Sequence, residues 1–467
     1  MRWLREALRQ PGQRLVLLVA GDTALAGTAF VVAVWLWTFT SGAEFGLDHL
    51  LALPGWLYAL IPAWLFLILP LYDPRRAAHL PGTARGIFLA SCAVGAIYLS
   101  VFFFLPRDLL PRLVFLYFGA SVAGLTLLWR AVYIRALESA FLQRRVIVVG
   151  AGWAGRTLLH AIRAHQPRMW DVIGLIDDAP DKHGQTYLGA PVLGGAEALV
   201  AAAHRYEATD VVLAVSGELH GETFQALLDC QAAGVPVMRM PALYEQLTGC
   251  VPIDHIDADW VNAAFIEPAQ QRFWYHAVKR GLDVAGALAG LLLMLPVWPL
   301  IVVGLWLESG WPVLYRQTRL GRAGRPFTIL KFRSMIHGAE ADGEARWATR
   351  DDERITPLGF WLRRTRLDES PQFINVLRGE MSLVGPRPER PEFTERLEQE
   401  IPFFRARLLA KPGLTGWAQI NYGYAGTVAD NALKLQWDLY YIKHQSPWLD
   451  VLIMLRTIPV IIGLRGT

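Results

Sequence analysis

Cysteine is scarce in this chain, and so is charge. Only three of the 467 residues are cysteine, Cys92, Cys230 and Cys250, and none forms a Cys-x-x-Cys pair. This argues against a disulfide framework or a cysteine zinc site and fits a reducing compartment. Charged residues make up 18% and hydrophobic residues 53% of the chain, whereas a soluble domain carries about 25% charge. We therefore expect neither a disordered chain nor a purely soluble one.

Lysine is rare as well, with six among the 45 basic residues, and the net charge is only +4. So small a net charge does not indicate a nucleic-acid-binding protein. The length allows about three domains.

Four long uncharged runs occupy the first third of the chain. They are Thr23–Ala43, Leu50–Tyr72, Gly86–Pro106 and Leu113–Trp129. Each is about long enough to cross ~30 Å of hydrocarbon as a helix. The sequence therefore predicts a bundle of four transmembrane helices over residues 1–135.

The basic residues of this region predict its orientation. The segment before the first run, the second loop and the segment after the fourth run are rich in arginine, whereas the first loop has no Lys or Arg. Because Lys and Arg are retained on the cytoplasmic side, both ends of the bundle should face the cytoplasm. We do not expect the first run to be a cleaved signal peptide, because its helix carries Asp22 and further apolar runs follow it at once.

A fifth uncharged run, Val284–Leu307, contains Pro296 and Pro299, which break or kink a helix. It is basic on both sides, with Lys279 and Arg280 before it and four arginines soon after. A segment that is positive at both ends should enter the membrane and return. We predict a re-entrant helix over residues 279–307; an ordinary fifth span is the alternative.

The middle of the chain has the pattern of an α/β domain. A β-branched run, Val146–Val149, leads into a Gly-x-Gly-x-x-Gly turn and then a helical segment. The turn glycines Gly150, Gly152 and Gly155, with Asp177 at the end of the next strand, are the candidate nucleotide-binding residues. We predict a Rossmann-like nucleotide-type domain over residues 145–265. The alternative is that the glycines only close a tight turn.

A reductase or dehydratase would also need a catalytic acid–base pair. Tyr275 and Lys279 form the one Tyr-x-x-x-Lys in the chain, but they lie outside this domain and beside the fifth run. We expect this pair to be an interfacial anchor.

The last third of the chain carries the candidate chemistry. Residues Arg316–Arg366 contain twelve basic and six acidic residues. Two adjacent carboxylates, Asp368 and Glu369, follow directly. Neighbours on a helix point about 100° apart, so the two should divide their work: one attacks, and the other holds a metal or steers a proton. A surface salt-bridge cluster is the alternative.

Other motifs follow in order. They are Lys331–Met335 (KFRSM), the Leu367-Asp368-Glu369 element, the Gly-Pro-Arg-Pro turn within Val384–Pro388, Lys411–Gln419 and Trp437–Ile442. The turn holds Arg387 on a stiff loop suited to a phosphate. The final apolar run, Trp448–Leu464, is interrupted by charge, so it should lie against the membrane or the core.

Together these motifs resemble the bacterial sugar transferase family, in its long monotopic form, over about residues 272–467. The resemblance implies a phosphoglycosyl transferase catalytic domain of α/β type, anchored by the re-entrant helix in the bacterial inner membrane with its soluble domains in the cytoplasm. It implies transfer of a sugar 1-phosphate from a UDP-sugar to undecaprenyl phosphate, with release of UMP, as the first membrane step of exopolysaccharide, capsule or O-antigen synthesis.

The resemblance also implies residue roles. Asp368 would attack the sugar-side phosphorus and form a covalent intermediate, and Glu369 would assist it and Mg²⁺. The residues expected to bind or support the substrates are Lys331, Arg333, Arg364, Arg366, Pro386, Arg387 and Asp438. The chain departs from the family pattern at Leu295, Arg366 and Ser370, where Ser, a hydroxyl residue and Leu are usual.

Two other functions remain open at this point: an NAD-dependent nucleotide-sugar dehydratase or epimerase, and a membrane scaffold. Membrane lipid is an expected partner and nucleic acid is not; a homodimer through the bundle or the middle domain is left open. The sugar is not indicated by any residue, although glucose or galactose is the usual choice of the family's long form.

Overall fold

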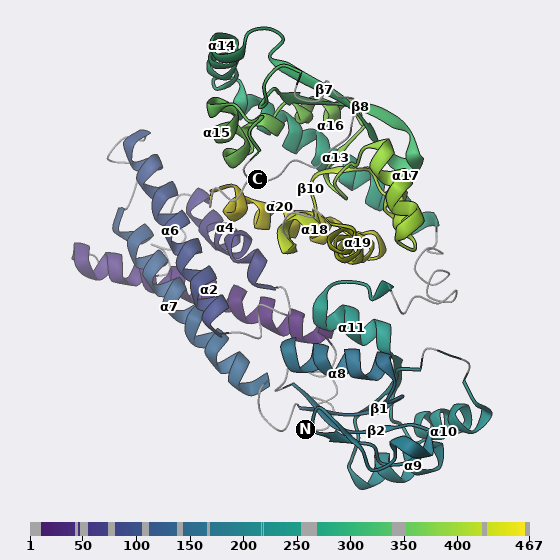
Figure 1. Cartoon of the computed structure of the whole chain (residues 1–467). Helices are drawn as coiled ribbons and strands as arrows, with labels where there is room; N and C mark the ends of the chain where they lie inside the picture. The colour runs from purple at the N-terminus through teal and green to yellow at the C-terminus, as the bar shows by residue number, and fades with distance from the viewer. Residues whose placement is uncertain are drawn as a thin grey trace. The chain divides into compact units, whose positions relative to one another are not determined.

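The computed structural model describes residues 11–42, 45–46, 55–72, 80–104, 112–137, 143–165, 169–215, 217, 219–253, 269–338, 352–422 and 427–462. The chain divides into two compact units, Met1–Leu243 and Tyr244–Thr467. Figure 1 shows the helical and α/β elements of both units along the chain.

The first part of unit Met1–Leu243 is helical. Its elements are α2 (Pro11–Ser41), η1 (Gly55–Ala59), α4 (Leu60–Leu67), η2 (Leu69–Tyr72), α6 (Leu80–Phe104) and α7 (Arg112–Leu137). Helix α7 packs against both α2 and α6 (Figure 1), and Phe30, Trp64 and Phe118 are buried between the helices. Among the described residues, Val16–Ser41 and Leu113–Arg135 are long and apolar enough to cross a membrane. The chain is therefore a membrane protein.

The second predicted run, Leu50–Tyr72, is not one continuous α-helix in its described part. It forms the eight-residue α4 between two 3-10 turns. Proline explains this: Pro62 lies in the first turn of α4, where a missing N–H is tolerated, and Pro70 follows its end. Residues 50–54 lie outside the described residues, as do Pro106 and the basic residues Arg2, Arg5, Arg9, Arg75, Arg76 and Arg107.

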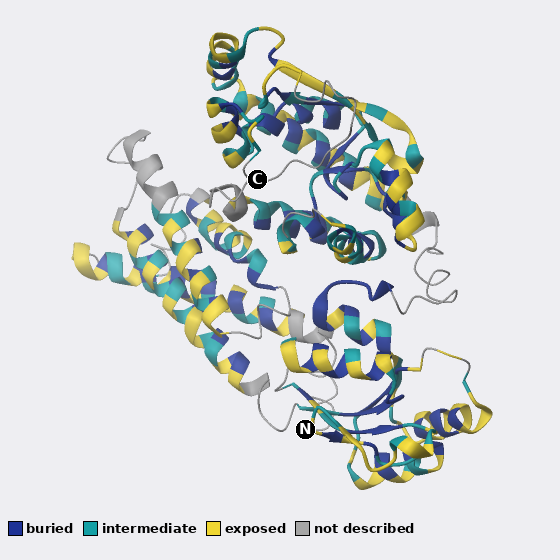
Figure 2. Ribbon diagram, in the orientation of Figure 1, coloured by how far each residue is buried: buried dark blue, intermediate teal, exposed yellow. Residues whose placement is uncertain are grey.

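A parallel four-stranded sheet follows in the same unit, as the sequence predicted. Its order is β2-β1-β5-β6, and its strands are β1 (Arg144–Val149), β2 (Trp170–Ile176), β5 (Asp210–Leu213) and β6 (Val237–Arg239). The other elements are α8 (Trp153–His165), η4 (Pro180–Lys182), β3 (Thr186–Tyr187), β4 (Ala190–Pro191), α9 (Ala196–Arg205) and α10 (Gly221–Ala232). Helix α11 (Met240–Thr248) begins in this unit and ends in the next. Figure 2 shows β1 and β2 largely buried, which explains their β-branched sequences. The arrangement is Rossmann-like.

Unit Tyr244–Thr467 contains two small sheets among helices. Its elements are α13 (Ala269–Met294), α14 (Trp298–Ser309), β7 (Leu314–Leu320), η6 (Arg322–Gly324), β8 (Pro326–Phe332), α15 (Pro357–Thr365), η7 (Leu367–Glu369), α16 (Gln372–Arg378), β9 (Ser382–Val384), α17 (Pro391–Glu400), η8 (Phe404–Leu409), β10 (Gly413–Thr415), α18 (Trp417–Asn421), α19 (Val428–Lys443) and α20 (Pro447–Ile462). Strands β7 and β8 pair antiparallel, and β9 and β10 pair parallel.

Helices α13 and α14 form one apolar pair that bends by 61°. The bend falls at residues 295–297, so the chain breaks where Pro296 was expected to break it. Helix α13 packs closely on β9 and α16: a Cβ at Gly286 would lie 2.5 Å from Leu383, and one at Gly290 would lie 2.5 Å from the ring of Phe373. These glycines allow the long helix to rest on β9 and α16.

Helix α20 covers most of the final apolar run. Leu449, Leu452 and Ile453 are buried, and so are the two charged residues Asp450 and Arg456. The described part of the run therefore packs into its own unit, which accounts for the charges that interrupt it.

Candidate active site

The adjacent carboxylates Asp368 and Glu369 lie in the single turn η7, directly after α15. Between the helix and the turn, Arg366 adopts a left-handed conformation with a φ of 58°, which ends α15 and redirects the chain. Both carboxylates are buried, with exposures of 7% for Asp368 and 6% for Glu369. Burial of both argues against a solvated surface salt-bridge cluster.

Glu369 is held by two cations. Its Oε1 accepts a hydrogen bond from Arg387 Nη2 at 2.7 Å and another from Lys331 Nζ at 3.1 Å. Burial acts to raise the pKa of Glu369, but the charges of Arg387 and Lys331 outweigh it and hold this pKa well below its usual value. Glu369 is therefore an ionised residue that positions two cations.

Asp368 is in the opposite situation. Its Oδ1 is buried and has no hydrogen-bond partner. Burial raises the pKa of Asp368 to about 6, and the neighbouring charge of Glu369 acts in the same direction. An ionised oxygen without a partner is costly to bury and is the kind of group that can attack an electrophile. The two carboxylates thus differ in their contacts and in the direction of their pKa shifts, and the division of roles expected from sequence stays a prediction.

The three arginines before the dyad take different positions. Arg364 is exposed, with its guanidinium 5.9 Å from the centres of two aromatic rings of its own helix. The charge of Arg366 acts to lower the pKa of Glu369. The charge of Arg363, which the sequence did not single out, acts to lower the pKa of Asp368. The structure therefore brings Arg363 and Arg366 to the carboxylates and leaves Arg364 away from them.

The turn that carries Arg387 is held by backbone contacts. The Gly385 amide donates to Thr415 O at 2.9 Å, and the Gly413 amide donates to Pro386 O at 2.8 Å. A Cβ at Gly385 would lie 2.2 Å from a backbone oxygen of the facing segment, and one at Gly413 would lie 2.0 Å from the Gly385 nitrogen. The Lys411–Gln419 motif is therefore the support on which Pro386 and Arg387 rest.

Arg333 is held by the end of α14 through one of its guanidinium nitrogens. Its Nη2 donates to the Ser309 carbonyl at 2.7 Å and to the Gly310 carbonyl at 2.6 Å. These are the last carbonyls of α14, so Arg333 ties the end of the bent helix pair to β8.

Asp438 also lies behind the site. It is 1% exposed, and its Oδ2 accepts from Arg407 Nη2 at 2.9 Å. The same Nη2 donates to the Arg387 carbonyl at 3.1 Å. Asp438 therefore supports the arginine turn through Arg407 and does not face the pocket described below.

Tyr275 and Lys279 are not an interfacial anchor, contrary to the expectation from sequence. Lys279 is 8% exposed, and its Nζ donates to Val384 O at 3.0 Å, Tyr441 OH at 3.1 Å and Asp450 Oδ2 at 3.0 Å. Tyr275 OH donates to the same Asp450 oxygen at 3.1 Å. Since a buried charge needs a partner, the pair is part of a network that holds the strand before the arginine turn.

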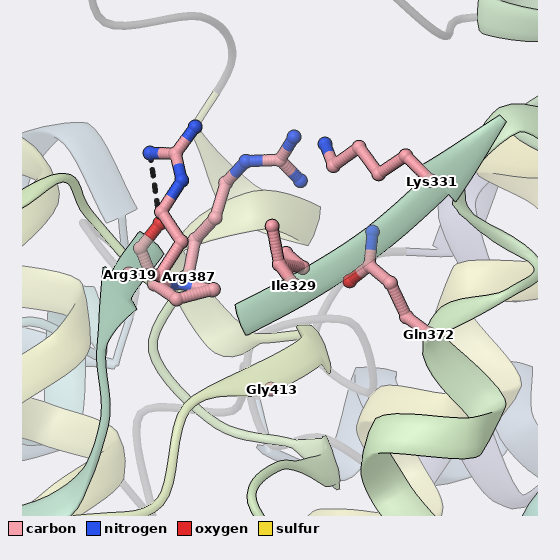
Figure 3. Close-up of a pocket in the computed structure, with 7 residues that line it drawn as sticks. Arg319, Ile329, Lys331, Gln372, Arg387 and Gly413 are labelled. Carbon is pink, nitrogen blue, oxygen red and sulfur yellow. Dashed lines mark hydrogen bonds between the residues drawn. The ribbon is translucent and has the colours of Figure 1, made fainter. Parts of the chain in front are cut away.

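A small pocket is lined by Lys331 and Arg387, the two cations that hold Glu369, and its space of about 240 Å³ is partly open to solvent. Its lining residues are Arg319, Ile329, Lys331, Gln372, Arg387, Pro388 and Gly413. Figure 3 shows the guanidinium of Arg387 and the ammonium of Lys331 pointing toward one another, with the Gln372 amide on the same side. Cations dominate this pocket, so it favours an anionic ligand.

The glycine turn of the other unit is closed by its own carboxylate. Asp177 accepts from the amide after Gly150 at 2.7 Å and from Lys182 Nζ at 3.0 Å. A Cβ at Gly155 would lie 2.0 Å from the Gly150 carbonyl, whereas Gly152 faces open space. Helix–strand packing therefore accounts for Gly155, and the turn accounts for Gly150, which has a φ of 110°. The carboxylate of Asp177 is therefore bound by groups of the protein itself, whereas a ribose-binding residue would need this carboxylate free.

The dyad offers a metal ion one buried oxygen without a hydrogen-bond partner. Mg²⁺ is usually held by one or two carboxylates together with substrate phosphates, and the unpartnered Oδ1 of Asp368 is an oxygen of that kind. Within the described ranges, no group of three His, Cys, Asp or Glu side chains is arranged to hold a metal ion. Because Glu369 Oε1 already accepts from Arg387 and Lys331, magnesium shared by both carboxylates stays a prediction.

Comparison with known proteins matches two families in this chain. Bacterial sugar transferase matches residues 274–463, and the CoA-binding domain family matches residues 68–241. The UDP-glucose:undecaprenyl-phosphate glucose-1-phosphate transferase of Caulobacter vibrioides is 43% identical over 183 residues, which cover 39% of this chain and 68% of that protein. The chain belongs to the bacterial sugar transferase family.

Two further relatives of this chain extend the match. The UDP-N-acetylgalactosamine-undecaprenyl-phosphate N-acetylgalactosaminephosphotransferase of Aeromonas hydrophila is 41% identical over 245 residues, 52% of this chain and 56% of its own. The undecaprenyl-phosphate glucose phosphotransferase of Komagataeibacter xylinus is 32% identical over 325 residues, 68% of this chain and 59% of its own. The chain thus spans somewhat more than half the length of these two relatives.

The sequence did not single out two residues of the pocket, and it marked Ser370 only as a departure from the family pattern. Gln372 and Arg319 line the pocket, and Ser370 accepts from the indole nitrogen of Trp298 at 3.0 Å. The last contact joins α14 to the dyad turn and gives the unusual serine a structural role. Gln372 lies three residues after Glu369, and this closeness in sequence to the dyad was the one feature that could have identified it.

Proposed function

We propose that this chain transfers a sugar 1-phosphate from a UDP-sugar to undecaprenyl phosphate and releases UMP. The observation that carries the proposal is the contrast within the dyad: Asp368 presents a buried oxygen without a partner, while Glu369 is held by Arg387 and Lys331. One carboxylate is free to attack, and its neighbour keeps two cations in place. The names of the relatives, which are undecaprenyl-phosphate sugar phosphotransferases, support the same activity.

The reaction takes place in two displacements at one phosphorus. An Asp368 oxygen attacks the sugar-side phosphorus of the donor, the bond from that phosphorus to the bridging oxygen breaks, and UMP leaves with the electron pair. A phosphate oxygen of undecaprenyl phosphate then attacks the same phosphorus and displaces the carboxylate. The second step restores ionised Asp368, so no oxidant or net proton is needed.

Cations make the first displacement feasible, because a carboxylate must approach a negatively charged diphosphate. Lys331, Arg387, Arg363 and Arg366 surround the dyad with positive charge and would stabilise the charge that moves onto the leaving phosphate. Asp368 and Glu369 would hold Mg²⁺, which when bound supplies further positive charge against the phosphates.

The membrane arrangement follows from the charge pattern. We assign residues 1–135 to a four-helix transmembrane bundle, 145–265 to a Rossmann-like domain and 272–467 to the catalytic domain, in a bacterial inner membrane with the soluble parts in the cytoplasm. The bent pair α13–α14 would enter the membrane and return, because its 61° bend and its basic flanks fit a hairpin. This places the dyad near headgroup depth, where the lipid phosphate and the water-soluble donor both reach it.

A panel of UDP-sugars tests the activity. Purified full-length protein, undecaprenyl phosphate, Mg²⁺ and each UDP-sugar in turn are mixed, and UMP release is measured. We expect one or two sugars to support release, with glucose, galactose and N-acetylgalactosamine as the first choices. If no sugar gives release that depends on undecaprenyl phosphate, the proposed function is wrong.

The donor-only step should depend on pH through Asp368. With its pKa at about 6, only about one tenth of the side chain is ionised at pH 5, so covalent labelling by the donor should slow about tenfold between pH 7 and pH 5. Glu369→Gln removes a charge that raises the pKa of Asp368. In this variant, the fall of the labelling rate at acid pH should therefore begin at a lower pH. The measurement is the labelling rate with donor radiolabelled at its sugar-side phosphate, from pH 4.5 to 8. An unchanged fall at acid pH in Glu369→Gln would contradict this assignment.

A further inference from the structure

The pocket beside Glu369 contains more hydrogen-bond donors than the protein satisfies. We call it the Gln372 pocket and define it by Arg319, Lys331, Gln372 and Arg387. These four side chains come from β7, β8, α16 and the arginine turn, so four separate segments converge on it. None of the steps proposed above assigns a role to Gln372 or Arg319.

Of Gln372 and Arg319, Gln372 gives the stronger evidence for a bound ligand. Its side chain is 2% exposed, and its Nε2 is buried without a hydrogen-bond acceptor. Figure 3 shows this amide directed into the space below Lys331. A buried N–H group without an acceptor costs stability, so its presence needs an explanation outside the folded chain itself.

Arg319 supplies a second donor of the same kind. Its Nη2 donates to Gln317 Oε1 at 2.7 Å and its Nη1 to Pro388 O at 3.4 Å, the contact drawn as a dashed line in Figure 3. Its Nε is buried and has no acceptor. Two unsatisfied donors therefore line one pocket from opposite sides of Ile329, as Figure 3 shows.

The charges of the pocket indicate the class of ligand. Three cations line it, and Glu369 neutralises Lys331 and Arg387 only in part because it carries one charge. Glu389 approaches Arg319 at 3.9 Å, but it is shared with Lys434 at 2.8 Å and Arg407 at 3.5 Å. An anion with several acceptor oxygens satisfies both the spare positive charge and the two open donors, and a phosphate group has this form.

We propose that the Gln372 pocket binds a substrate phosphate other than the one that Asp368 attacks, through Gln372 Nε2 and Arg319 Nε. The inference rests on the proposed function, which brings two such groups to the site: the phosphate that leaves with UMP and the terminal phosphate of the lipid acceptor. Both present the same oxygens. Gln372 is accordingly a substrate-binding residue, and the pocket holds one phosphate in place while the neighbouring phosphorus reacts.

Two substitutions at Gln372 test this. Gln372→Glu keeps the shape, removes the donor and adds a negative charge; Gln372→Leu removes the donor without adding charge. Gln399→Glu is the matched control, because Gln399 is exposed on α17 of the same unit. The full-length proteins are compared by UMP affinity in calorimetry, by KM for UDP-sugar and undecaprenyl phosphate, and by thermal unfolding.

We expect Gln372→Leu to weaken phosphate binding about tenfold, and Gln372→Glu more, because hydrogen bonds to charged groups are the strong ones. Weaker UMP binding with a raised KM for the donor assigns the pocket to the nucleotide phosphate. A raised KM for undecaprenyl phosphate alone assigns it to the acceptor phosphate. Either result supports the proposal, provided that Gln399→Glu behaves as the wild type does.

The proposal is overturned if both Gln372 variants keep UMP affinity and both KM values within about twofold of the wild type. It is also overturned if the changes follow a loss of thermal stability in both variants. Failure of the proposed function gives a different result, because then the wild-type protein itself releases no UMP from any donor.

Discussion

Asp368→Asn should abolish covalent labelling by the UDP-sugar donor and lower UMP release by about 10³-fold or more. The amide has no ionised oxygen, so the first displacement loses its nucleophile, and losses of this size are usual when a nucleophile is removed. The measurement is the amount of label that stays on the protein when donor radiolabelled at its sugar-side phosphate is supplied without undecaprenyl phosphate. Asp171→Asn, at an exposed position of β2, is the matched control and should label normally.

The same substitution should leave the protein at least as stable as before. The pKa of Asp368 is about 6 in the folded protein, above the ordinary value of 3.8, so the stability that its protonation contributes is present at low pH and is lost as pH rises through 6. Above that pH the buried charge costs up to about 3 kcal/mol, which Asn avoids. We expect Asp368→Asn to raise the melting temperature at pH 8 more than at pH 4. Full labelling of a well-folded Asp368→Asn protein would contradict the covalent mechanism.

Removing one partner of the Asp22–Arg130 pair should lower the free energy of unfolding by about 3–5 kcal/mol. Arg130 Nη2 and Asp22 Oδ2 are 2.6 Å apart, and both side chains are fully buried where α2 meets α7. Arg130 Nη1 also donates to Leu71 O at 3.1 Å, so the arginine joins a third segment to the pair. Arg130→Met would leave a buried carboxylate without a counter-charge, which is the costly situation.

Thermal unfolding of the full chain in detergent, followed by near-ultraviolet circular dichroism, measures this effect. Arg135→Met removes an exposed arginine from the same helix and is the control for losing the charge alone. The double variant Asp22→Leu with Arg130→Met should recover most of the stability, since replacing both members of a buried pair by apolar residues is often neutral. Equal melting temperatures for Arg130→Met and Arg135→Met would show that the pair does not stabilise the protein.

Local patterns predicted several elements closely. The β-branched run before the glycine turn lies in β1, and the break at Pro296 lies between α13 and α14. These features depend on side-chain periodicity and on proline, which act within a few residues. In the second apolar run, 3-10 turns flank the short α4 and prolines lie near both of its ends. Its crossing of the membrane stays a prediction.

Contacts between side chains that are distant in sequence were not predicted by these local patterns. Lys279 was expected at a membrane interface, yet it is bound by Asp450, which lies 171 residues later. Asp438 was expected at the substrate, yet it pairs with Arg407 and supports the arginine turn from behind. Both contacts join segments that are distant in sequence, so no local pattern contains them.

From its residues alone, this chain was recognisable as a membrane protein with a Rossmann-like region and an acidic pair set among arginines, because hydropathy, glycine spacing and charge are properties of short segments. Only the folded chain decided that Glu369 is engaged by Lys331 and Arg387 while Asp368 is left without a partner. The difference between these neighbours arises because burial and electrostatic attraction depend on distance in space, and three segments far apart in sequence meet at that turn.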